Sequence, residues 1–181
     1  MLQGKTIINP VIKDEVTYVH TAQSTNGKKT VVDIHLEPKG GLNLHYHKDF
    51  EETFEVQQGE LLVQIGKKKK KLVAGEKVTI KRYENHRFYS ESEKPTKFRG
   101  TLIPAHEGFE KSLAIVYGLA SDGLLNKKGI PKSFRHLAII ATMSGTNLPG
   151  LFTMIEWIFG IVAKSKKSKK IQEELITKYC Q

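Results

Sequence analysis

The sequence predicts a mainly β domain, a sandwich or barrel, followed by an α-helical C-terminal extension. Residues 15–104 contain many short β-prone runs separated by Gly, Lys, Pro and Glu-Asn, a spacing typical of sandwiches and barrels. After Pro104 the apolar residues change to helical spacing. We therefore expect a β domain over residues 1–107 and a helical extension over residues 108–181, which packs on the β domain or on a partner.

The β-prone runs begin with VTYVHTA and TVVDIHL, which alternate with a period of two residues. Asn26-Gly27 lies between them and predicts a type I′ hairpin, because both residues tolerate a positive φ. Further runs follow: LNLHYH, TFEVQ, ELLVQIG, KLVAGEKVTI, HRFYS and KFRGTLIP. The lysines from Lys67 to Lys71 fall between two of these runs, so we expect them at the exposed tip of a hairpin.

Helical segments are predicted throughout the C-terminal region. GFEKSLAIVYGLASDG ends at Gly123, and IPKSFRHLAIIATMSG has Pro131 near its start and Gly145 at its end. LPGLFTMIEWIFGIVAK opens near Pro149, and IQEELITKYC forms a fourth segment. The sequence shows no internal repeat.

The composition fits one ordinary globular domain with its own core. The chain has 181 residues, of which 39% are hydrophobic and 27% charged. Its one cysteine, Cys180, allows no intrachain disulfide, which fits a reducing compartment. The first residues lack the apolar segment of a secretory signal. We therefore expect a cytoplasmic protein.

The formal net charge of +10 is confined to two tracts of five lysines each, Lys67 to Lys71 and Lys164 to Lys170. Together these tracts account for the whole net charge. Proteins that bind nucleic acids usually spread basic residues over one face and interleave aromatic residues. The distribution therefore disfavours nucleic-acid binding.

Three histidines and one glutamate form a candidate metal site. His45 and His47 are two residues apart in a β-prone run, so their imidazoles share one face. Glu52 begins the next run and His86 opens a later one. This mainly nitrogen donor set suits Fe, Mn, Ni, Co or Zn better than Ca or Mg. We expect one divalent transition metal, although each residue alone is common without a metal.

The spacing of these residues resembles the first motif of the cupins. The pattern His-x-His-x4-Glu-x6-Gly is met by His45, His47, Glu52 and Gly59, and Gly40 or Gly41 approximately matches the leading glycine. The resemblance implies a jelly-roll β-barrel, frequent homodimers and metal binding. The functions it implies are diverse, and include dioxygenases, isomerases, decarboxylases, epimerases, storage proteins and ligand sensors.

The second cupin motif is matched in part. Gly75 and His86 stand at the expected places, whereas Lys81 replaces a proline, Tyr83 a glycine and Ser90 an asparagine. The resemblance covers roughly Val31 to Pro104. All the positions that ligate metal in cupins are present, so these departures affect the turn before His86 rather than the ligand set.

A small apolar pocket is expected around the metal. If Glu52 faces inward, residues two and four positions later face inward too, and so does the residue two positions after His86. Five residues are expected to line this pocket: Phe54, Val56, Gln64, Tyr83 and Phe88. We expect no metal-ligand role for the other histidines: His20, His35, His106 and His136.

Two functions follow from this site. The first is a metal-dependent oxygenase or isomerase acting on a small organic molecule. The second is a non-catalytic module that binds a metal or small ligand, with a helical tail for dimerisation or membrane contact. The complete ligand set favours the first, whereas the lack of an evident acid–base pair favours the second.

The apolar stretch LFTMIEWIFGIVA is too short to cross a membrane. One interpretation is a helix packed on the β domain or in a dimer, with the following lysines in a solvated segment before the last helix. The alternative is membrane-surface contact through residues 151–170. Phe152, Trp157 and Phe159 would then insert at an anionic surface that attracts the lysines.

Overall fold

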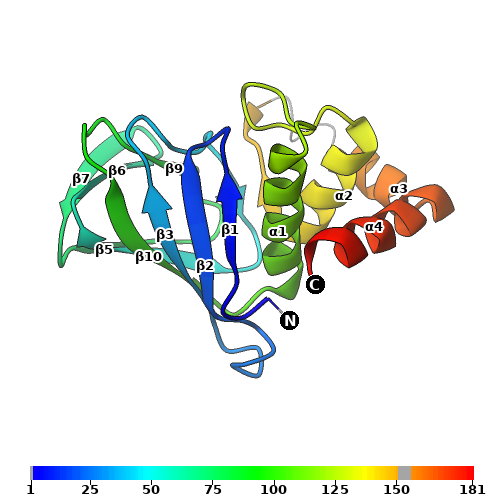
Figure 1. Ribbon diagram of the computed structural model, residues 1–181, viewed down its shortest axis with the longest axis horizontal. Coiled ribbons are helices and arrows are strands. Elements are labelled where there is room, and N and C mark those ends of the chain that lie inside the picture. Colours follow the sequence, from blue (N-terminus) through cyan, green and yellow to red (C-terminus); the bar gives the residue numbers. More distant parts are fainter. Residues whose placement is uncertain (1, 151–155) are drawn as a thin grey trace.

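The structure is a computed structural model that describes residues 2–150 and 156–181. It consists of a two-sheet β domain followed by helices (Figure 1). The β domain contains β1 (Thr6–Asn9), β2 (Asp14–His20), β3 (Thr30–Leu36), β4 (Tyr46–His47), β5 (Glu51–Gln58), β6 (Glu60–Ile65), β7 (Lys68–Val73), β8 (Lys77–Ile80), β9 (His86–Tyr89) and β10 (Thr96–Ile103). The C-terminal region contains α1 (Glu107–Ser121), α2 (Phe134–Ser144), β11 (Thr146–Asn147), α3 (Glu156–Lys164) and α4 (Lys166–Tyr179).

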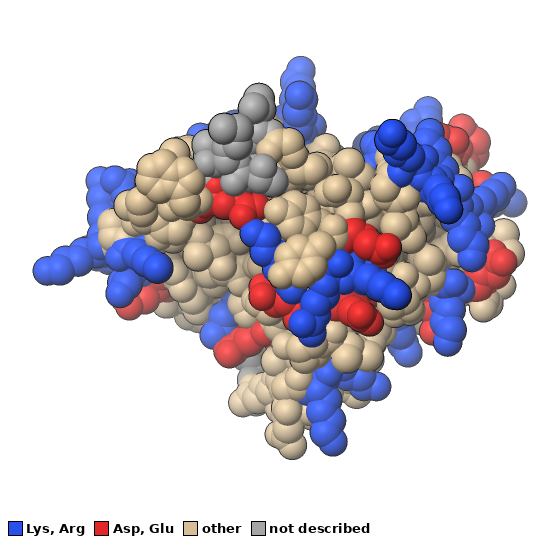
Figure 2. All heavy atoms as spheres, turned by 180° about the vertical axis from the view of Figure 1, so that it is seen from behind, with Lys and Arg blue, Asp and Glu red and all other residues tan. Residues whose placement is uncertain are grey.

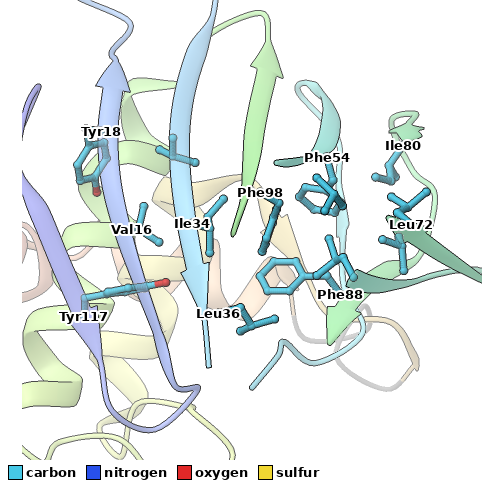
Figure 3. Close-up of a cluster of buried hydrophobic side chains, with 14 of the residues drawn as sticks. Val16, Tyr18, Ile34, Leu36, Phe54, Leu72, Ile80, Phe88, Phe98 and Tyr117 are labelled. Carbon is cyan, nitrogen blue, oxygen red and sulfur yellow. The ribbon is translucent and has the colours of Figure 1, made fainter. Parts of the chain in front are cut away.

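The β domain is a sandwich of two antiparallel sheets. The larger sheet has the strand order β1-β2-β3-β10-β5-β8, and the smaller has the order β7-β6-β9. Side chains from both sheets meet in one core, where Phe54, Phe88 and Phe98 pack edge to face (Figure 3). The prediction of a mainly β fold with a helical C-terminal extension is confirmed.

Strand alternation explains which residues enter this core. Along β10, Thr96, Phe98, Gly100 and Leu102 are buried, whereas the residues between them are more exposed. Successive side chains of a strand point to opposite faces, so a period of two in the sequence becomes one buried face. The same alternation places Phe54 and Val56 of β5 inside.

The two-residue hairpin predicted at Asn26-Gly27 is wrong. β2 ends at His20 and β3 begins at Thr30, so the connection spans residues 21–29. Asn26 and Gly27 do have positive φ values of 50° and 76°, as the dipeptide suggests. Hydrogen bonds from the loop's own Ser and Thr side chains shape the rest of this longer connection.

The first lysine tract also differs from its prediction. Most of it lies in β7, where Lys68 to Lys71 are exposed on a strand at the edge of the smaller sheet. Gly66 and Lys67 alone form the turn between β6 and β7. Figure 2 shows basic side chains gathered at this end of the molecule and at the opposite, helical end. Charged side chains on an edge strand discourage pairing with other chains.

α1 packs beside β1, and α2 and α4 pack against α1 (Figure 1). The Tyr18 hydroxyl of β2 donates to the backbone carbonyl of Glu110 in α1, at 2.8 Å. Glu110 in turn accepts hydrogen bonds from Thr30 Oγ1 and from the backbone NH of Ala22. A buried glutamate therefore ties α1 to the loop between β2 and β3.

The lysines of the second tract are exposed as expected, but they lie in helices rather than in a segment before the last one: Lys164 ends α3 and the other four belong to α4. Ser165 caps this helix by accepting from the backbone NH of Ser168, and Lys166 is the first helical residue. Phe159 of α3 is buried and packs against Phe134, so it does not point outward as the membrane-surface interpretation requires. Phe152 lies outside the described residues. No helix in the described ranges is long and apolar enough to span a membrane.

Candidate metal centre

The four predicted ligands converge in one buried cluster. Each offers one ligand atom, and these atoms all lie within 4.8 Å of one another. Glu52 Oε2 is 3.1 Å from His86 Nε2 and 3.5 Å from His47 Nε2. The ring centroids of His45 and His86 are 4.3 Å apart. The structure therefore brings together residues from both predicted motifs.

Backbone pairing between the two motifs produces this convergence. His45 and His86 form an antiparallel bridge, in which each backbone NH donates to the other residue's carbonyl, at 2.9 and 2.7 Å. His47 follows on β4, and Glu52 is the second residue of β5. The backbone NH of Tyr83 donates to the carbonyl of His47 at 2.7 Å. The turn before His86 is thus joined directly to the His-x-His strand.

The outer nitrogens of the imidazoles are held by neighbouring groups. His45 Nδ1 donates to the carbonyl of Asn43 at 2.8 Å, and His86 Nδ1 donates to the carbonyl of Glu84 at 2.9 Å. Because a carbonyl only accepts, these contacts place the proton on Nδ1 and leave Nε2 directed into the cluster. His47 Nδ1 lies 3.3 Å from Thr146 Oγ1 of β11.

The cluster contains a neutral imidazole at His45 and an ionised carboxylate at Glu52. Burial and the adjacent imidazoles of His86 and His47 lower the pKa of His45 to about 3, so this ring is neutral. Burial acts to raise the pKa of Glu52, but the imidazoles of His47 and His86 outweigh it and lower that pKa. Burial acts to lower the pKa of His86, and its hydrogen bond to the Glu52 carboxylate outweighs this and raises it.

The residues present fit one divalent transition metal. Neutral imidazole and ionised carboxylate are the forms that ligate metals. His47 Nε2 is buried and has no hydrogen-bond partner among the described residues, which is an unusual and costly state for a buried polar atom. Ligands about 2.1 Å from a shared ion lie at most ~4.2 Å apart, so a small contraction of the cluster would bring all four donors into range.

The cluster lies beside a largely apolar cavity of about 260 Å³. His45, His47 and Glu52 contribute to its wall, together with Phe54 and Phe88 of the β domain. The opposite wall comes from the C-terminal region and includes Phe109, Leu113, Val116, Leu137, Ile140 and Thr146. The helical extension is therefore part of the site and closes one side of it.

Backbone pairing fixes this cover over the ligands. β11 pairs with β4, with Thr146 opposite His47. The Tyr46 hydroxyl donates to Glu156 Oε1 of α3 at 2.9 Å, and Lys48 forms an ion pair with the same carboxylate. Residues on both sides of His47 in the His-x-His strand thus hold the extension in place.

The expected pocket wall is only partly the observed one. Phe54 and Phe88 line the cavity, whereas Val56 is buried deeper in the core. Gln64 does not reach the cavity, because Leu61 and Val63 occupy the inward face of β6. Gln64 Oε1 instead accepts from Arg87 Nε on the outer face.

Tyr83 is also outside the cavity wall. Its side chain is 65% exposed, and its φ of 67° lies in the left-handed region. Glycine adopts this conformation without strain, which explains the glycine at this position of the second motif. The resulting backbone turn directs the tyrosine ring toward solvent, so it neither narrows the mouth nor contacts the cavity.

Two residues of the cavity wall were not predicted from the sequence. Asp14 of β2 and Tyr117 of α1 line the same cavity, and the Tyr117 hydroxyl donates to Asp14 Oδ2 at 2.6 Å. They are 103 residues apart in sequence, and no motif connects them. The apolar positions around Tyr117 predict a helix but not the element on which it packs.

The other histidines lie outside the cluster. His106 accepts from the backbone NH of Phe109 through Nδ1 and caps α1. His35 lies on the outer side of β3, and its Nε2 is 3.4 Å from Glu37 Oε1. His136 belongs to α2, and His20 is exposed at the end of β2. None of them belongs to the cluster of potential ligands found among the described residues.

Comparison with known proteins supports the fold assignment. The family model described as "Cupin domain" matches residues 32–103. The comparison with curated proteins finds no match. Among solved structures, the chain is similar to a predicted oxalate decarboxylase from Thermotoga maritima, at 16% identity over 57% of this chain and 93% of that chain, with a TM-score of 0.51.

Other similar structures include a sugar phosphate isomerase of the cupin superfamily from Silicibacter pomeroyi and KdgF from a Halomonas species. The first is 17% identical over 55% of this chain and 70% of that one, with a TM-score of 0.49. The second is 15% identical over 52% and 81%, with a TM-score of 0.47. Identities this low concern the fold and not the activity. The family match and the two-sheet fold together show that this chain contains a cupin domain over residues 32–103, followed by a helical C-terminal region.

Proposed function

We propose that this protein is a metal-dependent cupin enzyme, of oxygenase or isomerase type, that acts on a small, largely apolar organic molecule. The observation that carries this proposal is the position of the ligand cluster on the wall of a largely apolar cavity. A structural metal site is usually closed by its protein ligands, whereas a catalytic one keeps access for a substrate. A cavity beside the ligands therefore favours a catalytic site over a structural one.

Some of these residues would hold the metal, and others would form the cavity wall. His45, His47, Glu52 and His86 would hold the metal. When bound, that metal would supply Lewis acidity or activation of dioxygen. Backbone carbonyls fix the imidazoles of His45 and His86, so two donors are oriented before any ion binds. Phe54 and Phe88 form apolar walls that exclude water from the ligand side of the cavity.

Metal content tests this proposal first. Purified protein is reconstituted with Fe, Mn, Ni, Co or Zn, freed of excess metal, and measured by elemental analysis. We expect about one metal ion per chain in the wild type and almost none in the double variant His45→Ala, His47→Ala. His35→Ala, a histidine on the outer side of β3, is the matched control and keeps the wild-type content. A wild type without transition metal would refute the proposal.

Activity of the metal-loaded protein tests the enzyme class. Oxygen consumption is measured with diols, keto acids and thiols, and isomerisation of hydroxy-carbonyl compounds is followed by proton NMR. We expect turnover that disappears in the double histidine variant and persists in His35→Ala. Metal binding without turnover across these panels would favour a non-catalytic binding module instead.

A second candidate function, a binding module at an anionic membrane surface, is favoured by one observation. Trp157 and Ile161 lie one turn apart on α3 and are 66% and 60% exposed. Lys164 ends the same helix, and the α4 lysines follow it. Basic residues near an anionic surface contribute about 1 kcal/mol each, and exposed aromatic residues add apolar insertion.

Liposome flotation tests this second candidate. We expect protein to float with vesicles that contain phosphatidylserine and not with neutral vesicles, and flotation to be lost in Trp157→Ala, Ile161→Ala. The predicted homodimer competes for the same exposed residues, so sedimentation velocity is measured in parallel. A monomer that ignores anionic vesicles would remove both the membrane and the dimer roles of this face.

A further inference from the structure

Asp14 is one of several polar residues in the cavity wall outside the ligand cluster. Asp14 is the first residue of β2, and its side chain is 3% exposed. Its Oδ2 accepts the Tyr117 hydroxyl, whereas its Oδ1 has no hydrogen-bond partner among the described residues. Figure 3 shows the Tyr117 ring lying across β2 beside Val16, with its hydroxyl directed into the interior.

The surroundings of this carboxyl group are apolar. Ile12, Val16, Ile34 and Val116 contribute to the same part of the cavity wall. Burial raises the pKa of Asp14 to about 7, and the hydrogen bond from Tyr117 opposes that rise. An unpaired polar atom in such a place costs about 1–3 kcal/mol. A carboxyl group that served packing alone would be better replaced by an apolar side chain.

Glu110 is a carboxylate with a structural role at the interface between the β domain and α1. It is also buried between the β domain and α1, but its Oε1 accepts from Thr30 and from the backbone of Ala22. Those bonds join the loop at residues 21–29 to the helix. Among the described residues, the Asp14 side chain bonds only to Tyr117, and Asp14 lines the cavity, which Glu110 does not.

We propose that Asp14, positioned by Tyr117, forms a hydrogen bond with a hydroxyl group of a ligand whose other end reaches the metal cluster; the hydroxyl group can donate to the carboxylate or accept from the carboxylic acid. This inference rests on the proposed function. The cavity volume of about 260 Å³ has room for roughly nine non-hydrogen atoms, if each takes the ~30 Å³ of a water molecule. The ligand class is therefore a short molecule with a metal-binding oxygen group, an apolar middle and an alcohol at its far end.

Straight-chain carboxylates are suitable probes, because their head group ligates metals. Binding of each carboxylate from butanoate to octanoate to zinc-loaded protein is measured by calorimetry, and each is compared with its ω-hydroxy counterpart. A hydrogen bond contributes about 0.5–1.5 kcal/mol, so we expect the hydroxyl group to tighten binding by ~3- to 10-fold at the chain length that spans the cavity.

Variants locate the effect. Asp14→Leu should remove the hydroxyl preference and keep the binding of the unsubstituted carboxylates. Glu110→Gln, the matched buried carboxylate outside the cavity, should keep the preference. An intermolecular nuclear Overhauser effect between the ω-methylene protons and the Tyr117 ring is expected in wild-type protein, and this measurement does not depend on the folding of any variant.

The outcomes separate this inference from the proposed function, since zinc content is measured on the same samples. Protein without zinc would refute the proposed function and this inference with it. Zinc-loaded protein with no hydroxyl preference at any chain length would overturn this inference alone. A preference that survives in Asp14→Leu, or carboxylates that do not bind zinc-loaded protein at all, would overturn it equally.

Discussion

Replacement of Asp14 by asparagine should make the protein more stable, and increasingly so as the pH rises. Asparagine is nearly isosteric and its amide oxygen still accepts the Tyr117 hydroxyl, but it carries no charge to bury. In the wild type, burial raises the pKa of Asp14 from 3.8 to about 7. The folded protein therefore binds this proton more tightly than the unfolded chain does.

The sign and size of the effect follow from linkage. Below pH 3.8 the carboxyl is protonated in both states and contributes nothing. Between pH 3.8 and about 7 the unfolded chain loses the proton while the folded protein keeps it, so stability falls by about 1.4 kcal/mol per pH unit. Above that range the loss is constant at roughly 4 kcal/mol. From pH 5 to pH 8 the expected loss is about 3 kcal/mol.

Urea unfolding of metal-free wild type and Asp14→Asn at pH 5 and pH 8 measures this loss. Other groups titrate in both proteins, so the difference between the two free energies of unfolding isolates Asp14. We expect the advantage of the variant to grow by about 3 kcal/mol from pH 5 to pH 8. Asp33→Asn, which removes a half-exposed partner of Arg99, is the control and should cost at most about 1 kcal/mol at either pH. An advantage of Asp14→Asn that is equal at both pH values would refute the reasoning.

Three further predictions concern the helical region and the cluster. A Cβ added at Gly118 overlaps the ring of Tyr179, so Gly118→Ala should lower the free energy of unfolding by about 1–3 kcal/mol in the same urea titrations. Gly160 is also helical but has open space around it, so Gly160→Ala should raise the free energy of unfolding by about 0.5–1 kcal/mol. Glu110→Ala leaves the buried Thr30 hydroxyl and the half-buried Ala22 NH unpaired and should cost about 3 kcal/mol. Glu110→Gln still accepts and should cost less than half as much; equal costs would contradict the assigned hydrogen bonds. Zinc at 100 times its dissociation constant should raise the free energy of unfolding of the wild type by about 2.7 kcal/mol, as measured by calorimetric melting. The same increase in His86→Ala would exclude this cluster as the binding site.

The metal cluster was predictable from sequence because two ligands follow from strand geometry and the other two from a spacing that resembles the cupin motifs. His45 and His47 share a face through strand alternation alone, and Glu52 follows after a short turn. His86 lies in a different strand, and the sequence analysis assigned it from the second motif; its backbone pairing with His45 is seen only in the structure. A short-range pattern therefore determined most of the cluster.

Residues whose placement depends on register or on distant packing were not predictable. The inward face of β6 is that of Leu61 and Val63, and an error of one residue placed Gln64 on the wrong side. Tyr83 lies at a turn whose left-handed backbone decides where its ring points. The pairing of Asp14 with Tyr117 depends on how α1 packs on the β domain, which no local pattern encodes.

The pairing of β11 with β4 has a consequence for how the metal would enter. All four ligands precede residue 87, whereas the segment that covers them begins with α1 at Glu107. Domains generally form from the N-terminus during synthesis, so the donor set would be complete while its cavity is still open to solvent. Metal acquired at that stage would then be enclosed as β11 docks, and its exchange afterwards would be governed by opening of the C-terminal cover rather than by the ligands themselves.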